Sequence, residues 1–393
     1  MKQNLISTRT EAEKAFLVGV DSKASADGWS IESSLEELSY LAKTAGAEVV
    51  GRLVQKMQRP SSTYYLGKGK LEELIKVRES CHYNVVIFND ELLPRQQRNL
   101  EESLNVEESL SVKVIDRTAL ILDIFARRAQ TREGQLQVEL AQHQYLLPRL
   151  AGQWSHLERL GGGIGTRGPG ESQLETDRRL LRKRIQRLES QIEAVRRHRA
   201  LYRQKRRDSG IPVVALIGYT NAGKSTLLNA LSNANVLVED KLFSTLDPVT
   251  RRLVLPNGRQ FLLTDTVGFI QKLPPSIVAA FRATLEELAE ADLLIHVVDI
   301  THTNAPEQFQ TVQDIMVELS LDRKPQLTVL NKMDKVVGDS EEMDKLALAA
   351  VFNPPDENTL TVSALKGWGL HKLLDKVSDE LTLNTPVQKL TTS

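Results

Sequence analysis

Over residues 1–116, short apolar runs alternate with longer stretches of helical periodicity. The apolar runs are AFLVGV (15–20), AEVV (47–50), NVVIF (84–88) and SVKVI (111–115). Helical stretches such as SLEELSYLAKTAG (34–46) lie between them. Strands separated by helices of about ten or more residues are typical of a parallel sheet. The pattern therefore predicts a small parallel α/β domain in residues 1–116.

The strand pattern stops at Arg117, and residues 117–208 favour two long helices. One is predicted from Arg117 to Pro148, and a second from about Gln173 to Lys205, with a capping box formed by Ser172 and Glu175. Apolar residues in the second helix repeat at spacings of seven, four and three, which is the a/d seam of a coiled coil. The seam consists of Leu174, Leu181, Ile185, Leu188, Ile192 and Val195. We expect an antiparallel helical hairpin over residues 117–208.

This middle segment is also the basic part of the chain. The protein has no net charge, but residues 117–208 contain 20 Lys and Arg against 10 Asp and Glu. The flanking segments are acidic, at −3 for residues 1–116 and −7 for residues 209–393. Such asymmetry indicates a polyanionic partner for the middle segment, although a solvated helix surface would give the same count. The candidate contacts are Arg178, Arg182 and Arg196, which lie off the seam.

The third segment, residues 209–383, begins with a buried-strand run and a phosphate-binding loop. PVVALI (212–217) precedes GYTNAGKS (218–225), which matches G-x-x-x-x-G-K-[ST], and TLLNALS continues as a helix. In such a P-loop, backbone N–H groups and the helix N-terminus hold the phosphates. Lys224 then reaches the β and γ phosphates, and the Ser225 hydroxyl coordinates Mg²⁺. The segment is therefore predicted to be a P-loop nucleotide-binding domain.

Three further motifs indicate which nucleotide is bound. DTVG (265–268) follows a strand and supplies a carboxylate that holds Mg²⁺ through water and a glycine N–H that senses the γ-phosphate. NKMD (331–334) favours guanine, because Asp334 can accept the N1 and N2 protons, a donor pair that adenine lacks. SAL (363–365) resembles the loop that supports guanine from the other side. Thr245 in FSTLDP is the candidate switch I threonine on Mg²⁺.

These motifs together predict a site for GTP and GDP with Mg²⁺ as its cofactor. The candidate nucleotide-binding residues are Gly218, Tyr219, Thr220, Asn221, Ala222, Gly223, Lys224, Ser225, Thr226, Asp265, Thr266, Val267, Gly268, Asn331, Lys332, Asp334, Ser363, Ala364 and Leu365. The metal ligands are Ser225, Thr245 and, through water, Asp265, and the candidate catalytic residues are Lys224, Thr245 and Gly268. Phe269 stands where many switch GTPases carry a water-orienting glutamine, so basal hydrolysis should be slow.

A second glycine-rich loop, GGGIGTRGPGES (161–172), lies between the two predicted helices. Gly163, Gly165 and Gly168 spell G-x-G-x-x-G, but no buried strand precedes them, which argues against a dinucleotide site. Glycines let a backbone approach RNA closely, and Arg167 can meet a phosphate or stack on a base. The loop is therefore a candidate RNA probe, with a flexible linker as the alternative.

The combination of GYTNAGKST, FSTLDP, DTVGFI and NKMD with the upstream GGGIGTRGPGESQLE and a basic hairpin resembles the HflX family of ribosome-associated GTPases. The resemblance covers residues from about 15 to 382, including YYLGKGKLEEL (64–74). It implies binding to the large ribosomal subunit and its ribosomal RNA, with the hairpin tip near the peptidyl-transferase centre. It also implies GTP-controlled splitting of stalled or idle ribosomes. A K⁺ ion held by Asn221 would resemble related potassium-dependent GTPases.

Two other classes of function stay open on the sequence alone. One is a signalling switch whose hairpin binds a protein, and the other is an RNA-remodelling NTPase with a second nucleotide site in its N-terminal domain, for which KGK (68–70) is the only support.

The single cysteine, Cys81, excludes an intramolecular disulfide, and no apolar run approaches the roughly 18 residues of a membrane span. The N-terminus lacks a signal-peptide core. We expect a cytoplasmic monomer with a disordered tail in residues 384–393.

Overall fold

The computed structural model describes residues 13–22, 29–105, 112–150, 169–208, 210–232, 242–243, 245–272, 274, 277, 282–338 and 357–383. The predicted RNA-probing residues Gly163, Gly165, Arg167 and Gly168 lie outside this part of the chain, as does the predicted tail. The chain divides into two compact units, Met1–Ile124 with Tyr145–Leu181, and Phe125–Gln144 with Arg182–Ser393. The boundaries between the units fall inside helices.

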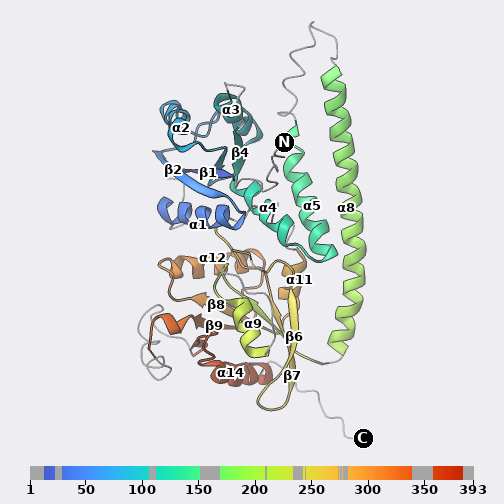
Figure 1. Ribbon diagram of the computed structural model, residues 1–393. Coiled ribbons are helices and arrows are strands. Elements are labelled where there is room, and N and C mark those ends of the chain that lie inside the picture. Colours follow the sequence, from blue (N-terminus) through green and yellow to red (C-terminus); the bar gives the residue numbers. More distant parts are fainter. Residues whose placement is uncertain are drawn as a thin grey trace, which may run out of the picture. The chain divides into compact units, whose positions relative to one another are not determined.

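The first unit contains a four-stranded parallel sheet in the order β2-β1-β3-β4 (Figure 1). Its strands are β1 (Lys14–Ser22), β2 (Glu48–Met57), β3 (Val85–Phe88) and β4 (Lys113–Asp116), and its connecting helices are α1 (Ile31–Thr44), α2 (Lys68–Cys81) and α3 (Pro94–Leu104). Phe16 and Val18 share a core with residues of α2 and α3, whereas Gly19 on the opposite face of β1 meets Leu35 of α1. The predicted parallel α/β fold is confirmed for this part of the chain.

The prediction of one continuous helix from Arg117 to Pro148 is wrong, because the chain forms two helices there. They are α4 (Arg117–Arg128) and α5 (Arg132–Leu146), and we call residues 129–131 the α4–α5 turn. The Thr131 hydroxyl accepts the backbone N–H of Gly134 at 3.0 Å and so caps α5 as a new helix. Apolar periodicity continues across so short an interruption, and only the capping threonine marks it.

The second long helix, α8 (Pro169–Asp208), begins earlier than predicted. Ser172 therefore lies within the helix and not at its N-cap, so the predicted capping box with Glu175 is wrong. Proline is favourable in the first turn of a helix, where a missing N–H costs no hydrogen bond. Pro169 is thus compatible with a helix that starts before Ser172.

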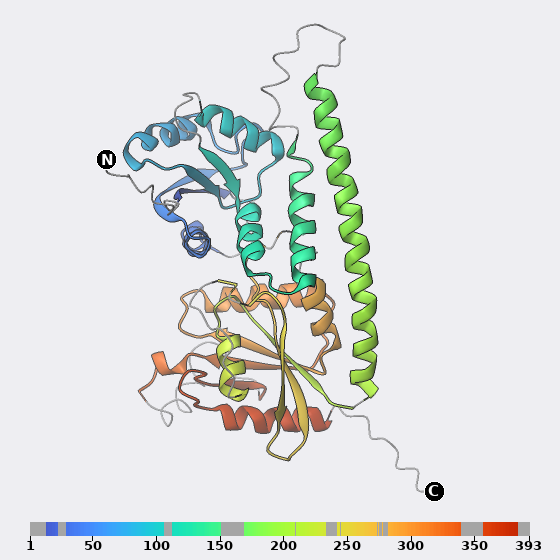
Figure 2. The same cartoon turned by 45° about the vertical axis from the view of Figure 1, so that its right-hand side comes forward.

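The predicted seam of α8 is its least exposed stripe. Leu188 is fully buried, and Leu181, Ile185, Ile192 and Val195 are half-buried. Within the second unit α8 runs antiparallel to α5, as Figure 2 shows. Arg184 pairs with Glu139 at 2.5 Å, and Arg199 pairs with Glu133 at 3.2 Å. The apolar seam and these ion pairs together hold the two helices side by side.

The remainder of the second unit is a six-stranded sheet in the order β10-β9-β8-β5-β7-β6, parallel except for β6. Its strands are β5 (Val213–Ile217), β6 (Val249–Val254), β7 (Gln260–Asp265), β8 (Leu293–Asp299), β9 (Gln326–Asn331) and β10 (Thr359–Thr361). Its helices are α9 (Lys224–Ser232), α11 (Arg282–Glu290), α12 (Ala305–Glu318) and α14 (Leu370–Leu383), with a 3-10 turn at Met333–Lys335. Because the carboxyl ends of parallel strands share one edge, the loops after β5, β7 and β9 lie together there.

Candidate nucleotide site

The predicted P-loop connects β5 to α9 at this edge of the sheet. Gly218 has a φ of +145° and Gly223 a φ of +96°, conformations that residues with a Cβ rarely adopt. A Cβ at Gly218 would also strike the carbonyl oxygen of Val297, and one at Gly223 would strike the Asn331 amide. Both glycines are thus required by backbone shape and by the lack of space, and they leave the loop wrapped around the start of α9.

Lys224, the first residue of α9, is buried inside the loop. Its ammonium group donates hydrogen bonds to the carbonyl oxygens of Gly218 at 3.1 Å and Tyr219 at 2.8 Å. Burial lowers the pKa of Lys224 from 10.5 to about 8, and the nearby charge of Asp265 opposes this shift. The N-terminus of α9 adds further positive potential. The loop is therefore suited to an anion, which would stabilise the charged form of the lysine.

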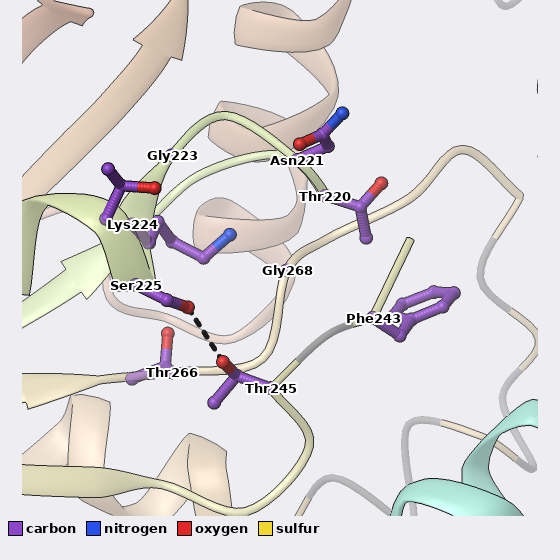
Figure 3. A pocket seen from close by; sticks show the side chains of 10 residues that line it. Thr220, Asn221, Gly223, Lys224, Ser225, Phe243, Thr245, Thr266 and Gly268 are labelled. Carbon is purple, nitrogen blue, oxygen red and sulfur yellow. Dashed lines mark hydrogen bonds between the residues drawn. The ribbon is translucent and has the colours of Figure 1, made fainter. Parts of the chain in front are cut away.

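Ser225, Thr245 and Asp265 meet beside Lys224 although they come from three separate segments. The Ser225 hydroxyl donates to an Asp265 oxygen at 2.6 Å and lies 2.7 Å from the Thr245 hydroxyl (Figure 3). Burial raises the pKa of the Asp265 carboxyl, while the Lys224 charge acts in the opposite direction. Within the described residues, Asp265 Oδ1 is buried without a hydrogen-bond partner. These oxygen donors suit a hard cation such as Mg²⁺, which is bound through few carboxylates.

The DTVG segment closes directly onto the P-loop. A Cβ at Gly268 would lie 2.7 Å from the Cα of Thr220 and 2.9 Å from the Lys224 nitrogen, so only glycine fits this approach. The next residue, Phe269, accepts the Thr220 N–H at 2.8 Å and donates its own N–H to Gly218 at 3.0 Å. Its side chain is buried and offers no hydrogen-bonding group to a water molecule. Phe269 therefore cannot take the part of the water-orienting glutamine that many switch GTPases carry at this position.

A pocket opens between these segments, and one of its lining residues is not predicted by the sequence motifs. It is lined by Thr220, Asn221, Gly223, Lys224, Ser225, Thr226, Phe243, Thr245, Thr266 and Gly268 (Figure 3). The residue that the motifs do not predict is Phe243, and its place in FSTLDP near the predicted metal ligand Thr245 is the sequence signal for it. Tyr219 is among the predicted nucleotide-binding residues, and its buried hydroxyl also accepts the Gln271 N–H at 2.8 Å, which ties the segment after DTVG to the P-loop.

The NKMD and SAL segments lie together next to the P-loop. The Asn331 side chain donates to the Ala222 carbonyl at 2.9 Å and accepts the Ala364 N–H at 3.0 Å, so it joins three loops. Asp334 accepts a hydrogen bond of 2.5 Å from the buried Ser363 hydroxyl, which orients the carboxylate predicted to bind guanine. Lys332 pairs with Asp299 at 2.7 Å. In contrast, Leu365 is 72% exposed.

The candidate RNA-binding arginines of α8 differ in their surroundings. Arg196 pairs with Glu286 of α11 at 2.6 Å and approaches Glu193 at 3.8 Å. Arg182 is exposed and Arg178 half-exposed, and neither has an ion-pair partner among the residues that the structure describes. Arg196 therefore contributes to packing in the second unit, whereas Arg178 and Arg182 keep their charges available to another molecule.

Across the described ranges, no helix is long and apolar enough to cross a membrane. The same ranges hold no group of three or more His, Cys, Asp or Glu side chains that could bind a metal.

Three family models match successive parts of the chain. Residues 32–126 match a model described as GTP-binding GTPase N-terminal, and residues 128–206 match one described as GTP-binding GTPase Middle Region. Residues 213–332 match a model described as 50S ribosome-binding GTPase. The first two matches cover the α/β domain from α1 onward and most of the helical segment, and the third covers the P-loop, DTVG and the first two residues of NKMD.

Individual relatives extend over almost the whole chain. GTPase HflX from Caldanaerobacter subterraneus subsp. tengcongensis is 48% identical over 96% of this chain and 82% of its own length. GTPase HflX from Alkalihalophilus pseudofirmus is 51% identical over 91% of this chain and 84% of its own length. A crystal structure of a GTP-binding protein from Sulfolobus solfataricus in complex with GDP is 27% identical, covers 95% of this chain and 100% of that chain, and has a TM-score of 0.45. The assignment to a family rests on the sequence identities to the two HflX proteins.

Proposed function

The chain belongs to the HflX family of GTPases, and from this premise we propose that it binds the large ribosomal subunit and, in its GTP state, splits stalled or idle ribosomes into subunits. Hydrolysis of GTP would then allow release. The observation that carries the proposal is the basic surface of α8, where Arg182, Arg187 and Arg197 are exposed without ion pairs among the described residues. Phosphate groups of ribosomal RNA would neutralise such charges and release counterions.

In the proposed GTP state, the P-loop amides and Lys224 hold the phosphates, and Asp334 selects the guanine base. Ser225, Thr245 and Asp265 would hold Mg²⁺, which neutralises charge on the β and γ phosphates when bound. Two buried oxygens, Thr220 Oγ1 and Asp265 Oδ1, have no hydrogen-bond partner within the described chain, and a bound nucleotide with its hydrated metal would satisfy such groups.

Slow basal hydrolysis is expected from this arrangement, because Phe269 cannot orient water. We propose that the missing group comes from the ribosome or from a K⁺ ion beside Asn221. Asn221 has a φ of +62°, a left-handed conformation that asparagine tolerates better than most residues, and its side chain lines the pocket. A comparison of hydrolysis in potassium and sodium buffers tests the cation, and equal rates would exclude it.

We further propose three functional parts. Residues 1–116 form the N-terminal α/β domain, residues 117–208 the basic hairpin that reaches RNA, and residues 209–383 the GTP-binding domain. The glycine-rich loop at 161–172 would supply a further RNA contact, through Gly163, Gly165, Arg167 and Gly168.

Sucrose-gradient sedimentation of intact ribosomes tests the proposed function. The protein with a non-hydrolysable GTP analogue should convert ribosomes into free subunits, and the protein with GDP should not. An intact ribosome peak, with the protein remaining at the top of a low-salt gradient, would favour the alternative of a signalling GTPase that binds another protein. Unwinding of free RNA driven by ATP, without any change in ribosomes, would favour an RNA-remodelling NTPase.

A further inference from the structure

Asp247 in the FSTLDP segment makes a set of contacts that the nucleotide site does not explain. Its carboxylate accepts the backbone N–H of Gln130 at 2.8 Å and of Thr131 at 2.9 Å, and it also accepts the Thr131 hydroxyl. These donors belong to the α4–α5 turn, 116 or 117 residues earlier in the chain. All of these residues lie in the second unit. Asp247 is therefore bound to the turn through three donors, and it does not line the nucleotide pocket.

The turn is built to receive this carboxylate. Its three backbone N–H groups are all used, since Ala129 donates to the Phe125 carbonyl at 2.9 Å and the other two donate to Asp247. The Thr131 hydroxyl donates to Asp247 while it accepts the Gly134 N–H at 3.0 Å. A Cβ at Gly134 would collide with the Asp247 carboxylate, so the glycine provides the space for it.

A second contact joins the same two regions through apolar packing. Phe243, from the segment that carries Thr245, packs edge-to-face on Phe125 of α4, with ring centroids 4.8 Å apart and planes at 89°. Both side chains are buried, at 2% and 0% exposure. Phe243 and Asp247, on either side of Thr245, are thus held outside the P-loop fold, Phe243 by the ring of Phe125 in α4 and Asp247 by the donors of the α4–α5 turn.

These anchors restrict where the Thr245 hydroxyl can lie. Only Leu246 lies between Thr245 and Asp247, so their Cα atoms are at most about 7 Å apart and a movement of one displaces the other. Pro248 limits the backbone of Asp247 to extended conformations, and β6 begins at the next residue, Val249. Release of Asp247 from the turn would therefore allow Thr245 to move away from Ser225, which it approaches to 2.7 Å.

We propose that Asp247 is a positioning residue for GTP hydrolysis, which fastens switch I to the α4–α5 turn and thereby holds Thr245 at the metal site. The coupling is reciprocal, because a nucleotide that draws Thr245 toward the metal also stabilises the turn at the base of the hairpin. The consequence for ribosomes rests on the proposed function above. The positioning itself concerns only the GTPase, so it is tested without ribosomes.

The experiment is single-turnover GTP hydrolysis by the full-length protein over a range of Mg²⁺ concentrations, with GDP affinity measured in parallel. Asp247→Ala should lower the rate about tenfold and raise the Mg²⁺ concentration for half-maximal rate, because charge-assisted hydrogen bonds are lost. GDP affinity should change less than about twofold, since the P-loop and base loops are untouched. Asp247→Asn keeps an acceptor and should recover most of the rate, and Asp322→Ala serves as an exposed carboxylate control.

The turn is tested by changing its other side. Thr131→Val removes the hydroxyl far in sequence from every nucleotide motif and should lower the rate about threefold with the same Mg²⁺ shift. Thr131→Ser keeps the donor and the helix cap and should behave as wild type. If Asp247→Ala fails to fold, the Thr131 pair decides alone. Unchanged hydrolysis in the Ala and Val variants, or a loss of GDP affinity equal to the loss of rate, would overturn the proposal.

Discussion

The nucleotide pocket and the basic face of α8 use charge in opposite ways. Lys224 is enclosed, donates to two loop carbonyls and has a pKa lowered to about 8, whereas Arg182 and Arg187 are exposed and hold no ion pair among the described residues. A buried charge must be matched by the groups around it, so the pocket can accept only a small anion that fits those groups. Exposed charges remain hydrated until a large anionic surface displaces their counterions. Nucleotide binding and ribosome binding should therefore be separable by mutation.

The largest effect on nucleotide binding is expected from a substitution of Lys224. Lys224→Ala removes the only side-chain cation predicted to contact the β and γ phosphates, and GTP affinity should fall at least about 100-fold. Fluorescence titration with a labelled GTP measures the loss. Lys372→Ala, on the exposed surface of α14, is the matched control and should bind normally. A loss below about tenfold would mean that the backbone amides alone hold the phosphates.

The next largest effect is a change of base preference. Asp334→Asn should weaken GTP binding about 30-fold, because the carboxylate accepts two guanine protons, whereas the amide accepts only one and turns its own NH₂ donor toward the other. Xanthosine triphosphate, which accepts where guanine donates, should bind better than GTP to this variant. Competition titrations with both nucleotides measure the switch. Undiminished GTP affinity would remove Asp334 from the base site.

On the hairpin, charge reversal should leave the pocket intact. Arg178→Glu combined with Arg182→Glu should weaken ribosome association about tenfold and reduce the dependence of affinity on salt, since fewer phosphate contacts release counterions. Nucleotide affinity should stay at the wild-type value. Arg196→Gln is an informative comparison. Because Arg196 is already paired with Glu286, this substitution should alter the salt dependence of ribosome binding less. An effect of Arg196→Gln as large as that of the double variant would mean that the Arg196–Glu286 pair opens on the ribosome.

The smallest effect expected is on pH dependence. The pKa of Lys224 is lowered to about 8 in the nucleotide-free protein, so the lysine is charged below that pH and loses its proton as pH rises through it. Phosphate binding requires the charged form, and GTP affinity should therefore fall about fourfold between pH 7 and pH 8.5. Lys224→Arg keeps its charge throughout this range and should show little change. A flat profile in the wild type would place the lysine pKa well above 8.

The features that the sequence predicted are local, and the features that it missed depend on residues far apart in the chain. The P-loop, DTVG and NKMD segments could be identified because each motif is short and its chemistry depends on neighbouring residues. The parallel sheet of the first domain followed from apolar runs, and the seam of α8 followed from regular spacing. The site assignments themselves remain predictions, although the structure places Ser225, Thr245 and Asp265 in contact.

The missed features depend on contacts between distant residues. Asp247 and Thr131 are 116 residues apart, and neither carries a pattern that points to the other. The break between α4 and α5 leaves apolar periodicity intact and depends on a threonine cap and on a carboxylate from another segment. The capping box at Ser172 matched a local signature, but the helix began earlier at Pro169. Tertiary contacts decided these cases, and a single sequence does not display them.

The most direct test of the central claim is sedimentation of ribosomes with a variant in which residues 161–170 are shortened. This change leaves every nucleotide-binding motif in place, so GTP binding should equal that of the wild-type protein. Ribosome splitting with a GTP analogue should nevertheless be abolished, because the proposed RNA probe is gone. If the shortened variant binds GTP and splits ribosomes at the normal rate, the glycine-rich loop is a linker and the proposed division between the pocket and the hairpin is contradicted.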